Sequence, residues 1–565
     1  MKRNLERFLP EAKGAQLTGA SVGLGILVGL VVAAFDYITL DVFFHRLVEL
    51  PLWAQAIAPM VGLAISALVL RFVGGGITGS TSDEYISAYH ARSPNLPWRP
   101  LPARLMAGVA TIGMGGALGV EGPSIYAGST IGVQLSRRLE RWLGRDAVKL
   151  LLTAGAAAGV AAVFQAPATG VIFALEAPYR DDLAHRALLP ALFASASSYL
   201  TFISMPFIQP EALLDQAWSI GLGAGDLVAA LAIGVGAGVG GRAFAHFVRR
   251  AKLIAKSTAT HWLVLGGGLL LGSLAIVSDR LYGEPLTLGP GVNTVEWLLE
   301  ERSFQLVALL FGFRFMATLV TVGSGGVGGL FIPLAVQGVL LGRLVGVGLE
   351  EVGINPESVR LLPILGLAAF LAAGYRTPIA AVMFVAESTG NSGSAVVPAL
   401  IAAAVSQLVA GRHSVSAGQQ VERLGHLEGR FTLPVTAALT TDVLTVPPDA
   451  TVSEFVWVHA LGRRQTVVPV VDGDRYVGLC KVEDCSQIDR DAWEHTTVAD
   501  VTSTDLPTAT PSWTLRDVVA AMEDGHSDII AVTDRDGIFI GVVIEAEIVK
   551  LGEILDETEG SQSSS

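Results

Sequence analysis

One stretch of the sequence, residues 115–124, reads Gly115-Gly116-Ala117-Leu118-Gly119-Val120-Glu121-Gly122-Pro123-Ser124. A carboxylate inside an apolar stretch is costly, so it is by default a functional residue. The glycines around Glu121 leave backbone N–H groups accessible, and Pro123 suits the first turn of a helix. Free N–H groups at the positive end of a helix attract anions. The stretch therefore predicts an anion site that the Glu121 carboxylate can itself occupy, with an ordinary helix cap as the alternative.

Two other glycine-containing breaks follow related patterns. The second break reads Gly325-Gly326-Val327-Gly328-Gly329-Leu330-Phe331-Ile332-Pro333 and predicts either another helix start with accessible N–H groups or a packing turn. The third break, residues 79–84, contains Ser80 and Asp83. We expect the Ser80 hydroxyl to donate a hydrogen bond to an anion, although Ser80 and Asp83 also have the spacing of a capping box.

The composition of the chain is that of a membrane protein. Of its 565 residues, 51% are hydrophobic and 16% are charged, 64 are glycine, and the mean hydropathy is +0.54. These values exclude a disordered or collagen-like chain and disfavour a soluble enzyme. Apolar segments fill most of residues 17–410, but several are shorter than the ~20 residues that a span needs. Interrupted helices of this kind in two halves indicate an all-α polytopic transport domain.

Charge divides the chain into two parts. Residues 431–565 contain 24 Asp and Glu against 8 Lys and Arg, whereas the preceding residues have a net charge of +3. A basic apolar part followed by an acidic part indicates a membrane domain joined to a water-exposed domain, and the acidic surface argues against nucleic acid as a partner. Basic residues before the first apolar segment place the N-terminus on the cytoplasmic side, and no secretory signal is evident.

The acidic part contains a tandem repeat. Residues 441–488 and 502–554 each combine a Pro-containing entry, an amphipathic helix (451–461 and 514–522) and two β runs. We expect the β runs at 466–471 with 476–479, and at 529–532 with 538–543. The repeat predicts a compact α+β pair. Cys480 and Cys485 have no His or Cys companions, so we expect them to be reduced and structural, with no metal site.

The three breaks together resemble the CLC family of chloride channels and chloride/proton antiporters. Residues 119–123 match the family motif G-[RK]-E-G-P except at Val120, and residues 329–333 match G-x-F-x-P in full. The motif G-S-G-I-P survives only as Gly79-Ser80. Residues 164–176 are similar to the family segment around F-N-A-P, and the tail repeats resemble paired CBS domains.

The resemblance implies a fold and a set of site residues. The fold would be two inverted halves of broken and tilted helices (about 17–220 and 221–425 within a domain at 17–430), preceded by a cytoplasmic segment at 1–16. A CBS-like regulatory pair (433–492 and 493–554) and an acidic disordered tail (555–565) would follow. Glu121 matches the gating glutamate. The anion-binding positions would be Ser80, Gly119, Val120, Gly122, Leu330, Phe331, Ile332 and Ser416. The protein would be a homodimer with one pore per subunit in the cell (inner) membrane, with its N-terminus and CBS domains cytoplasmic.

Two departures from the family pattern bear on the transport mechanism. The inner glutamate of the proton-coupled members corresponds to Ala177, and the pore tyrosine corresponds to Ser416. Both replacements favour channel-like or weakly coupled flow of chloride or other small anions. The alternative is a chloride/proton antiporter with a substitute proton path through Glu176, Asp181 or Asp182.

The CBS-like pair offers one position for a nucleotide. Asp484 matches the position that holds a ribose hydroxyl, so an adenine nucleotide is one interpretation and a ligand-free dimerisation and gating module is the other. No cofactor is required for transport. A CBS-regulated magnesium transporter is a remote alternative, because the intramembrane carboxylates Glu121, Glu176 and Glu387 are widely separated in the sequence. An intramembrane hydrolase is disfavoured, because the ten histidines occur singly at segment edges.

Overall fold

The computed structural model describes most of the chain. The described residues are 2–91, 93–144, 147–208, 224–256, 260–298, 303–351, 361–388, 393–421, 433–462, 465–504, 506–525, 527–548 and 550–551. The chain divides into two compact units, Met1–Arg423 and Leu424–Ser565. The predicted disordered tail at 555–565 lies outside the described residues.

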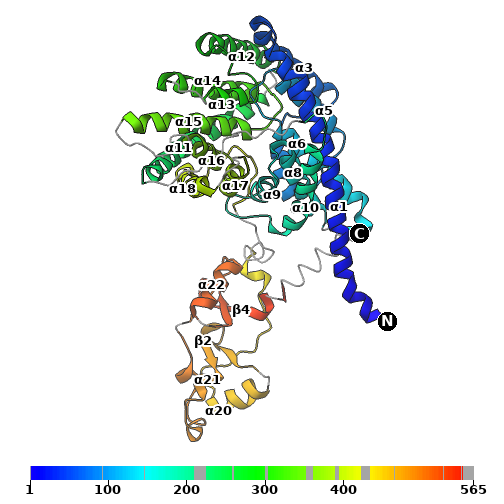
Figure 1. Cartoon of the computed structure of the whole chain (residues 1–565). Coiled ribbons are helices and arrows are strands. Elements are labelled where there is room, and N and C mark those ends of the chain that lie inside the picture. Colours follow the sequence, from blue (N-terminus) through cyan, green and yellow to red (C-terminus); the bar gives the residue numbers. More distant parts are fainter. Residues whose placement is uncertain are drawn as a thin grey trace. The chain divides into compact units, whose positions relative to one another are not determined.

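The first half of the larger unit is entirely helical. Its elements are α1 (Lys2–Tyr37), η1 (Ile38–Phe44), α2 (His45–Val48), α3 (Leu52–Phe72), α4 (Ser82–His90), α5 (Pro100–Gly113), α6 (Glu121–Arg138), α7 (Glu140–Leu143), α8 (Ala147–Phe164), α9 (Pro167–Glu176), η2 (His185–Ala187) and α10 (Leu188–Ile203). Helix α8 packs against α6, α9 and α10, and these helices lie side by side in Figure 1. Helix α1 begins at Lys2 and continues past residue 16, so the expected separate N-terminal segment is part of the first long helix.

The second half repeats this pattern of long and half-length helices. Its elements are α11 (Ala224–Ala255), α12 (Thr260–Tyr282), α13 (Val292–Trp297), α14 (Phe304–Gly323), α15 (Phe331–Glu351), α16 (Leu362–Tyr375), α17 (Pro378–Ser388) and α18 (Gly393–Ala410). Among the described residues of the chain, eight helices are long and apolar enough to cross a membrane. The shorter ones, including α9, α16 and α17, are the half-length elements that the interrupted apolar segments predicted.

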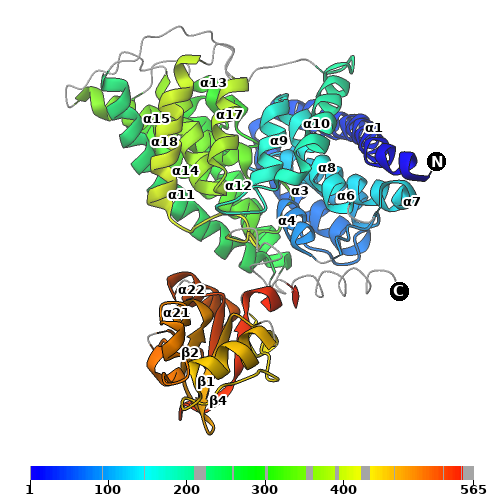
Figure 2. The ribbon, with the colours of Figure 1, turned by 90° about the horizontal axis from the view of Figure 1, so that it is seen from below.

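A backbone bridge connects the two halves of the membrane domain. Gly119 and Gly329 exchange two backbone hydrogen bonds, with N···O distances of 3.0 and 2.7 Å, in an isolated antiparallel bridge. Figure 2 shows the blue-to-cyan helices of the first half beside the green-to-yellow helices of the second. Gly119 and Gly329 occupy corresponding places in the glycine-rich breaks of the two halves, just before α6 and α15. The N-termini of α6 and α15 therefore meet at this bridge.

Threonine side chains brace the same junction from both halves. The amide of Val327 donates to Thr111 Oγ1, and the amide of Ala117 donates to Thr321 Oγ1, both at 3.1 Å. Both threonines are buried. Each half thus supplies an acceptor for a buried N–H group in the glycine-rich break of the other half, and an unpaired N–H there would cost free energy.

The smaller unit contains two similar α+β repeats. Their elements are η4 (Val435–Ala437), α20 (Val452–Glu454), η5 (Phe455–Leu461), β1 (Val467–Asp472), β2 (Arg475–Lys481), α21 (Val482–Cys485), η6 (Arg490–Ala492), η7 (Val498–Val501), α22 (Leu515–Gly525), β3 (Ile529–Thr533) and β4 (Phe539–Ile544). Strands β1 and β2 form one antiparallel hairpin, and β3 and β4 form another. These strands lie within a residue or two of the predicted β runs. Each repeat has its own buried core, and the free cysteines Cys480 and Cys485 lie in the first.

Candidate anion site

Glu121 begins α6 at the junction of the two halves, where it is 1% exposed. Its Oε1 accepts a hydrogen bond from the backbone N of Phe331, the first residue of α15, at 2.6 Å. A Cβ atom added to Gly119 or to Gly329 would collide with the Glu121 carboxylate. The two glycines therefore make the space in which this carboxylate lies, and the positive end of α15 attracts it.

The neighbouring N–H groups have separate partners. The N–H of Leu330 donates to the Tyr375 hydroxyl at 3.3 Å, and the backbone of Ile332 interacts with the Glu121 carboxylate. The N–H of Gly119, predicted to bind an anion, instead donates to the Gly329 carbonyl, because the bridge between the halves uses it. In this structure the amides of the second half hold the carboxylate and a hydroxyl.

The two remaining predicted positions of the first half, Val120 and Gly122, adjoin Glu121 in the sequence. Val120 is the buried residue that precedes α6. A Cβ on Gly122 would contact Thr81 Oγ1 and the backbone of Gly328, so a close approach of three segments requires glycine there. The glycines at 119 and 122 therefore allow close packing at this junction as well as access to N–H groups.

Aromatic side chains fix the position of Phe331. Its ring centroid lies 4.3 Å from that of Phe164, 5.1 Å from Phe384, 5.6 Å from Phe173 and 6.3 Å from Tyr375. Because these rings come from α8, α9, α16 and α17, the packing of four helices positions the Phe331 N–H group. Contacts between rings at such separations are favourable beyond the area that they bury.

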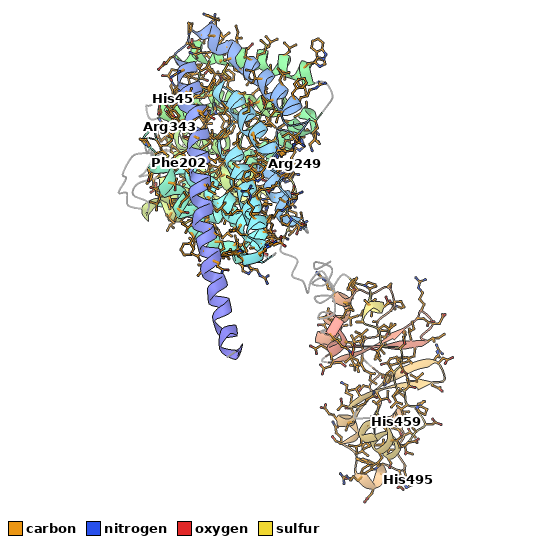
Figure 3. The ribbon with its side chains drawn as sticks, turned by 90° about the vertical axis from the view of Figure 1, so that its right-hand side faces the viewer. His45, Phe202, Arg249, Arg343, His459 and His495 are labelled. Atoms are coloured by element: carbon orange, nitrogen blue, oxygen red, sulfur yellow. The ribbon has the colours of Figure 1, made fainter. Side chains whose placement is uncertain are left out.

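A cavity of about 1360 Å³ reaches this junction. Gly328, Gly329 and Leu330 are among its lining residues, and Gly329 adjoins the Glu121 carboxylate. Ser80, Tyr375 and Ser416 line it, so the structure brings two predicted anion-binding side chains to one cavity. The Lys and Arg residues among its described lining are Arg71, Arg249, Lys252 and Lys256, and the acidic residues are Asp83 and Glu84. Arg249 is labelled in Figure 3. An excess of positive charge around a cavity with low-dielectric protein walls raises the local anion concentration.

The break at residues 79–84 differs from its predicted geometry. Helix α4 begins at Ser82, and Thr81 precedes it without a side-chain cap. The Ser80 hydroxyl lies 3.5 Å from Asp83 Oδ2 rather than capping the helix. Ser416 is 5% exposed, and its N–H donates to Ser414 Oγ at 3.1 Å.

Glu176 and Glu387 cap the helices of opposite halves. Glu176, at the end of α9, accepts hydrogen bonds from the N–H groups of Ile379 and Ala380 in the first turn of α17 at 3.1 and 2.9 Å. Glu387, near the end of α17, accepts from the N–H groups of Ala168 and Thr169 in the first turn of α9 at 2.9 and 2.6 Å. The Thr169 hydroxyl also donates to Glu387 at 2.6 Å.

This reciprocal capping bears on the predicted proton path. Both Glu176 oxygens accept backbone N–H groups, and Glu176 is not among the residues that line the cavity. Asp181 pairs with Arg376 at 2.7 Å, and Asp182 accepts the N–H of Leu183 at 2.6 Å. The structure therefore gives these three carboxylates structural partners.

Sequence reasoning missed Tyr375, although the sequence contains a signal for it. Phe164, Gln165 and Pro167 correspond to Tyr375, Arg376 and Pro378 at a constant offset, and Glu176 to Glu387 likewise. Gln165 and Arg376 both have positive φ angles, 51° and 59°, the only ones among the non-glycine residues that the structure describes. A search for an internal repeat finds Tyr375 as the second-half counterpart of Phe164.

The smaller unit contains the predicted ribose contact and the two cysteines. Asp484 lies in α21, and its Oδ2 lies 3.4 Å from the Ser503 hydroxyl. The hydrogen bond to Cys485, together with burial, raises the pKa of the Cys480 thiol. This favours the protonated, unreactive form. No group of three or more His, Cys, Asp or Glu able to hold a metal ion occurs among the described residues.

Two helical halves that meet at a carboxylate, an array of backbone N–H groups and a basic cavity define a membrane transport domain. Residues 61–411, more than half of the chain, match the family described as voltage gated chloride channel, and residues 435–488 and 498–553 match the CBS domain. The chain belongs to this family, the CLC family, and carries a C-terminal pair of CBS domains. The sequence-based identification and fold class are therefore confirmed.

Individual relatives agree with this assignment. An H(+)/Cl(−) exchange transporter named ClcA, from Vibrio parahaemolyticus, is 30% identical over 364 residues, which are 60% of this chain and 73% of that protein. The crystal structure of a slow cyanobacterial Cl−/H+ antiporter has a TM-score of 0.60 at 23% identity, covering 70% of this chain and 94% of the other. A eukaryotic CLC transporter has a TM-score of 0.60 at 19% identity, covering 94% and 98%. The two solved structures support the fold.

Proposed function

We propose that the chain carries chloride or other small anions across the membrane along a path that Glu121 gates. The observation that supports this most is the Glu121 carboxylate in contact with the Phe331 N–H group, next to Gly329 and Leu330 in the lining of a basic cavity. A carboxylate that occupies an anion site blocks it, and an anion enters when the carboxylate leaves. Binding by N–H groups and hydroxyls, without a direct full positive charge, is weak enough for the ion to depart.

We further propose channel-like or weakly coupled transport. Ala177 replaces the inner glutamate of the proton-coupled members, and the acidic residues described in the cavity lining, Asp83 and Glu84, are paired with Lys252 and Arg104. The absence of a tyrosine at Ser416 is a weaker argument than the sequence suggested, because the Tyr375 hydroxyl lines the same cavity from α16.

Chloride/proton exchange is the second candidate. The Vibrio relative is named an exchange transporter, and the Tyr375 hydroxyl and Glu121 carboxylate accept hydrogen bonds from the adjacent N–H groups of Leu330 and Phe331. A hydroxyl beside a carboxylate can pass a proton to it, because the hydroxyl both accepts and donates hydrogen bonds.

One experiment separates the two candidates. Chloride efflux from proteoliposomes under a set potential is measured while external pH is recorded, with Glu121→Ala and Glu84→Gln as gate and control variants. Chloride flow without proton movement supports the channel-like proposal, and proton uptake driven by a chloride gradient supports exchange. Absence of chloride flow from correctly folded, reconstituted protein overturns the proposed function.

The setting of the protein and the role of the tail are proposals as well. We propose a homodimer with one pore per subunit in the inner membrane, as the resemblance to the CLC family implies. We further propose that the N-terminus and CBS pair are cytoplasmic, because basic residues precede and follow the spans on that side. Cross-linking in membranes and protease protection of the tail test these two points. An adenine nucleotide at Asp484 is testable by calorimetric titration of the full chain with ATP, using Asp484→Asn as the control.

A further inference from the structure

The two cysteines of the chain contact each other inside the first CBS repeat. The sequence contains two cysteines in all, Cys480 and Cys485. Cys480 lies near the end of β2 and Cys485 ends α21, and their Sγ atoms are 3.9 Å apart. Both are free thiols, and neither is more than 1% exposed. The fold therefore brings together two thiols that anion transport does not use.

The surroundings make the two thiols unequal. The hydrogen bond from the Cys480 thiol lowers the pKa of Cys485, although burial and the neighbouring Asp484 carboxylate act in the opposite direction. The same hydrogen bond and burial raise the pKa of Cys480. Because the thiolate is the nucleophile, Cys485 is the sulfur that reacts first with an electrophile. Cys480 keeps its proton and lies next to the reacting sulfur.

A short helical turn covers Cys485. Helix α21 is four residues long, and Glu483, Ser486 and Gln487 around Cys485 are exposed. A short exposed turn opens at a lower free-energy cost than the core strands of the same repeat. Opening of this turn uncovers the Cys485 sulfur while the hairpin of β1 and β2 stays folded.

We propose that Cys480 and Cys485 are a redox modification site, at which a peroxide converts the two thiols into an intramolecular disulfide. This inference goes beyond the proposed anion transport and does not depend on it. The sulfur atoms move from 3.9 Å apart to about 2 Å when the bond forms. The four-residue α21 and the turn after it accommodate this approach.

The reaction has two balanced steps. The Cys485 thiolate attacks one oxygen of hydrogen peroxide, so that an S–O bond forms, the O–O bond breaks, and the departing hydroxide takes up the proton that Cys485 released. The Cys480 sulfur then attacks the sulfenic acid at Cys485, so that an S–S bond forms, the S–O bond breaks, and hydroxide leaves with the Cys480 proton as water. Two thiols and one peroxide give one disulfide and two waters, and a dithiol reductant reverses the change.

The disulfide acts on the connection between the two CBS repeats. Leu479, next to Cys480, exchanges two backbone hydrogen bonds with Ser503 at 3.1 and 2.9 Å. Asp484, next to Cys485, lies 3.4 Å from the Ser503 hydroxyl. Ser503 belongs to the segment between the two repeats, so a shift of α21 toward β2 changes the contacts of this segment and of the predicted ribose contact.

The test counts thiols in the full-length protein. The reduced, detergent-solubilised chain is treated with hydrogen peroxide, then denatured, labelled with N-ethylmaleimide and measured by intact mass spectrometry. We expect both labels to be lost together, with a fall in the unlabelled mass of two hydrogen atoms, and dithiothreitol should restore both labels. Because the chain has two cysteines, a disulfide within one chain joins Cys480 to Cys485.

Single-cysteine variants separate the two roles. Cys480→Ser should stop at the sulfenic acid of Cys485, which dimedone traps, whereas Cys485→Ser should react with peroxide more slowly and give less dimedone adduct. Alanine at either position serves if the serine variant does not fold. The proposal is overturned if the folded wild type keeps both labels at a peroxide concentration that oxidises the urea-denatured chain. Formation of sulfinic acid or of a disulfide between chains, without the internal disulfide, would overturn it as well.

Discussion

Removal of the reciprocal helix caps should destabilise the membrane domain in a predictable order. Glu387 accepts three hydrogen bonds from the first turn of α9, and Glu176 accepts two from the first turn of α17. The N–H groups of Thr169 and Ala380, both buried residues, bond to these carboxylates. Replacing either glutamate by alanine leaves N–H groups at a helix start without partners and removes a charge that the helix dipole favours.

The structure sets the expected magnitudes. A hydrogen bond to a charged group contributes about 1.5–3 kcal/mol, and an ordinary bond about 1 kcal/mol. Because such bonds do not add fully, we expect Glu387→Ala to cost about 4 kcal/mol and Glu176→Ala about 3 kcal/mol. Glutamine at either position keeps one acceptor oxygen and should cost roughly half as much.

Thermal unfolding in detergent, followed by size-exclusion chromatography of the remaining folded protein, measures this order. Glu49→Ala, at an exposed residue between α2 and α3, is the matched control and should leave the unfolding temperature unchanged. Chloride and proton fluxes of folded Glu176→Gln protein should resemble those of the wild type, since capping is its role here. Loss of proton movement with an unchanged unfolding temperature would refute this reasoning and make Glu176 a proton relay.

Three further predictions concern other parts of the chain. Tyr375→Phe keeps the ring in its aromatic cluster but removes the hydroxyl, which in the proposed function donates a hydrogen bond to the anion. Chloride flux at low chloride should therefore fall about tenfold, the effect of one lost hydrogen bond of ~1.4 kcal/mol, and an unchanged flux would exclude the hydroxyl from the anion path. Thr111→Val and Thr321→Val each leave a buried N–H group unpaired and should cost similar amounts, about 1–3 kcal/mol, in thermal unfolding, with serine at each position restoring stability. Asp500 lies in a capping box, where hydrogen bonds from the Thr497 side chain and backbone lower the pKa of its carboxyl. Its stabilising contribution is therefore present above its unfolded pKa and is lost as pH falls through its folded pKa. Asp500→Asn should weaken the acid dependence of unfolding of the CBS unit below about pH 5, and an unchanged acid dependence would contradict that assignment.

Local patterns determined the class of each element. Apolar segments broken by glycine and proline predicted half-length helices, because these residues favour helix ends and an open helix end at membrane depth must be buried. Alternating β runs around an Asp/Gly turn predicted the hairpins β1–β2 and β3–β4, since a strand pattern depends on neighbours in the sequence. The sequence also indicated that Glu121 would lie at a helix start among N–H groups, because a carboxylate among apolar residues needs a partner.

The partners of these residues depended on tertiary structure. Glu121 meets Phe331, Glu176 meets α17 and Asp83 meets Lys252, and each pair joins segments that are remote in the sequence. The sequence indicates which buried groups need hydrogen-bond partners, but not which distant residue supplies each partner. The sequence therefore determined that this chain is a broken-helix membrane domain with a CBS pair. Two features depended on how one half packs against the other: the hydrogen bond from the Gly119 N–H to the Gly329 carbonyl, and the position of the Tyr375 hydroxyl in the cavity wall. Tertiary structure decided them because a buried polar group pairs with whichever donor or acceptor the fold brings within reach.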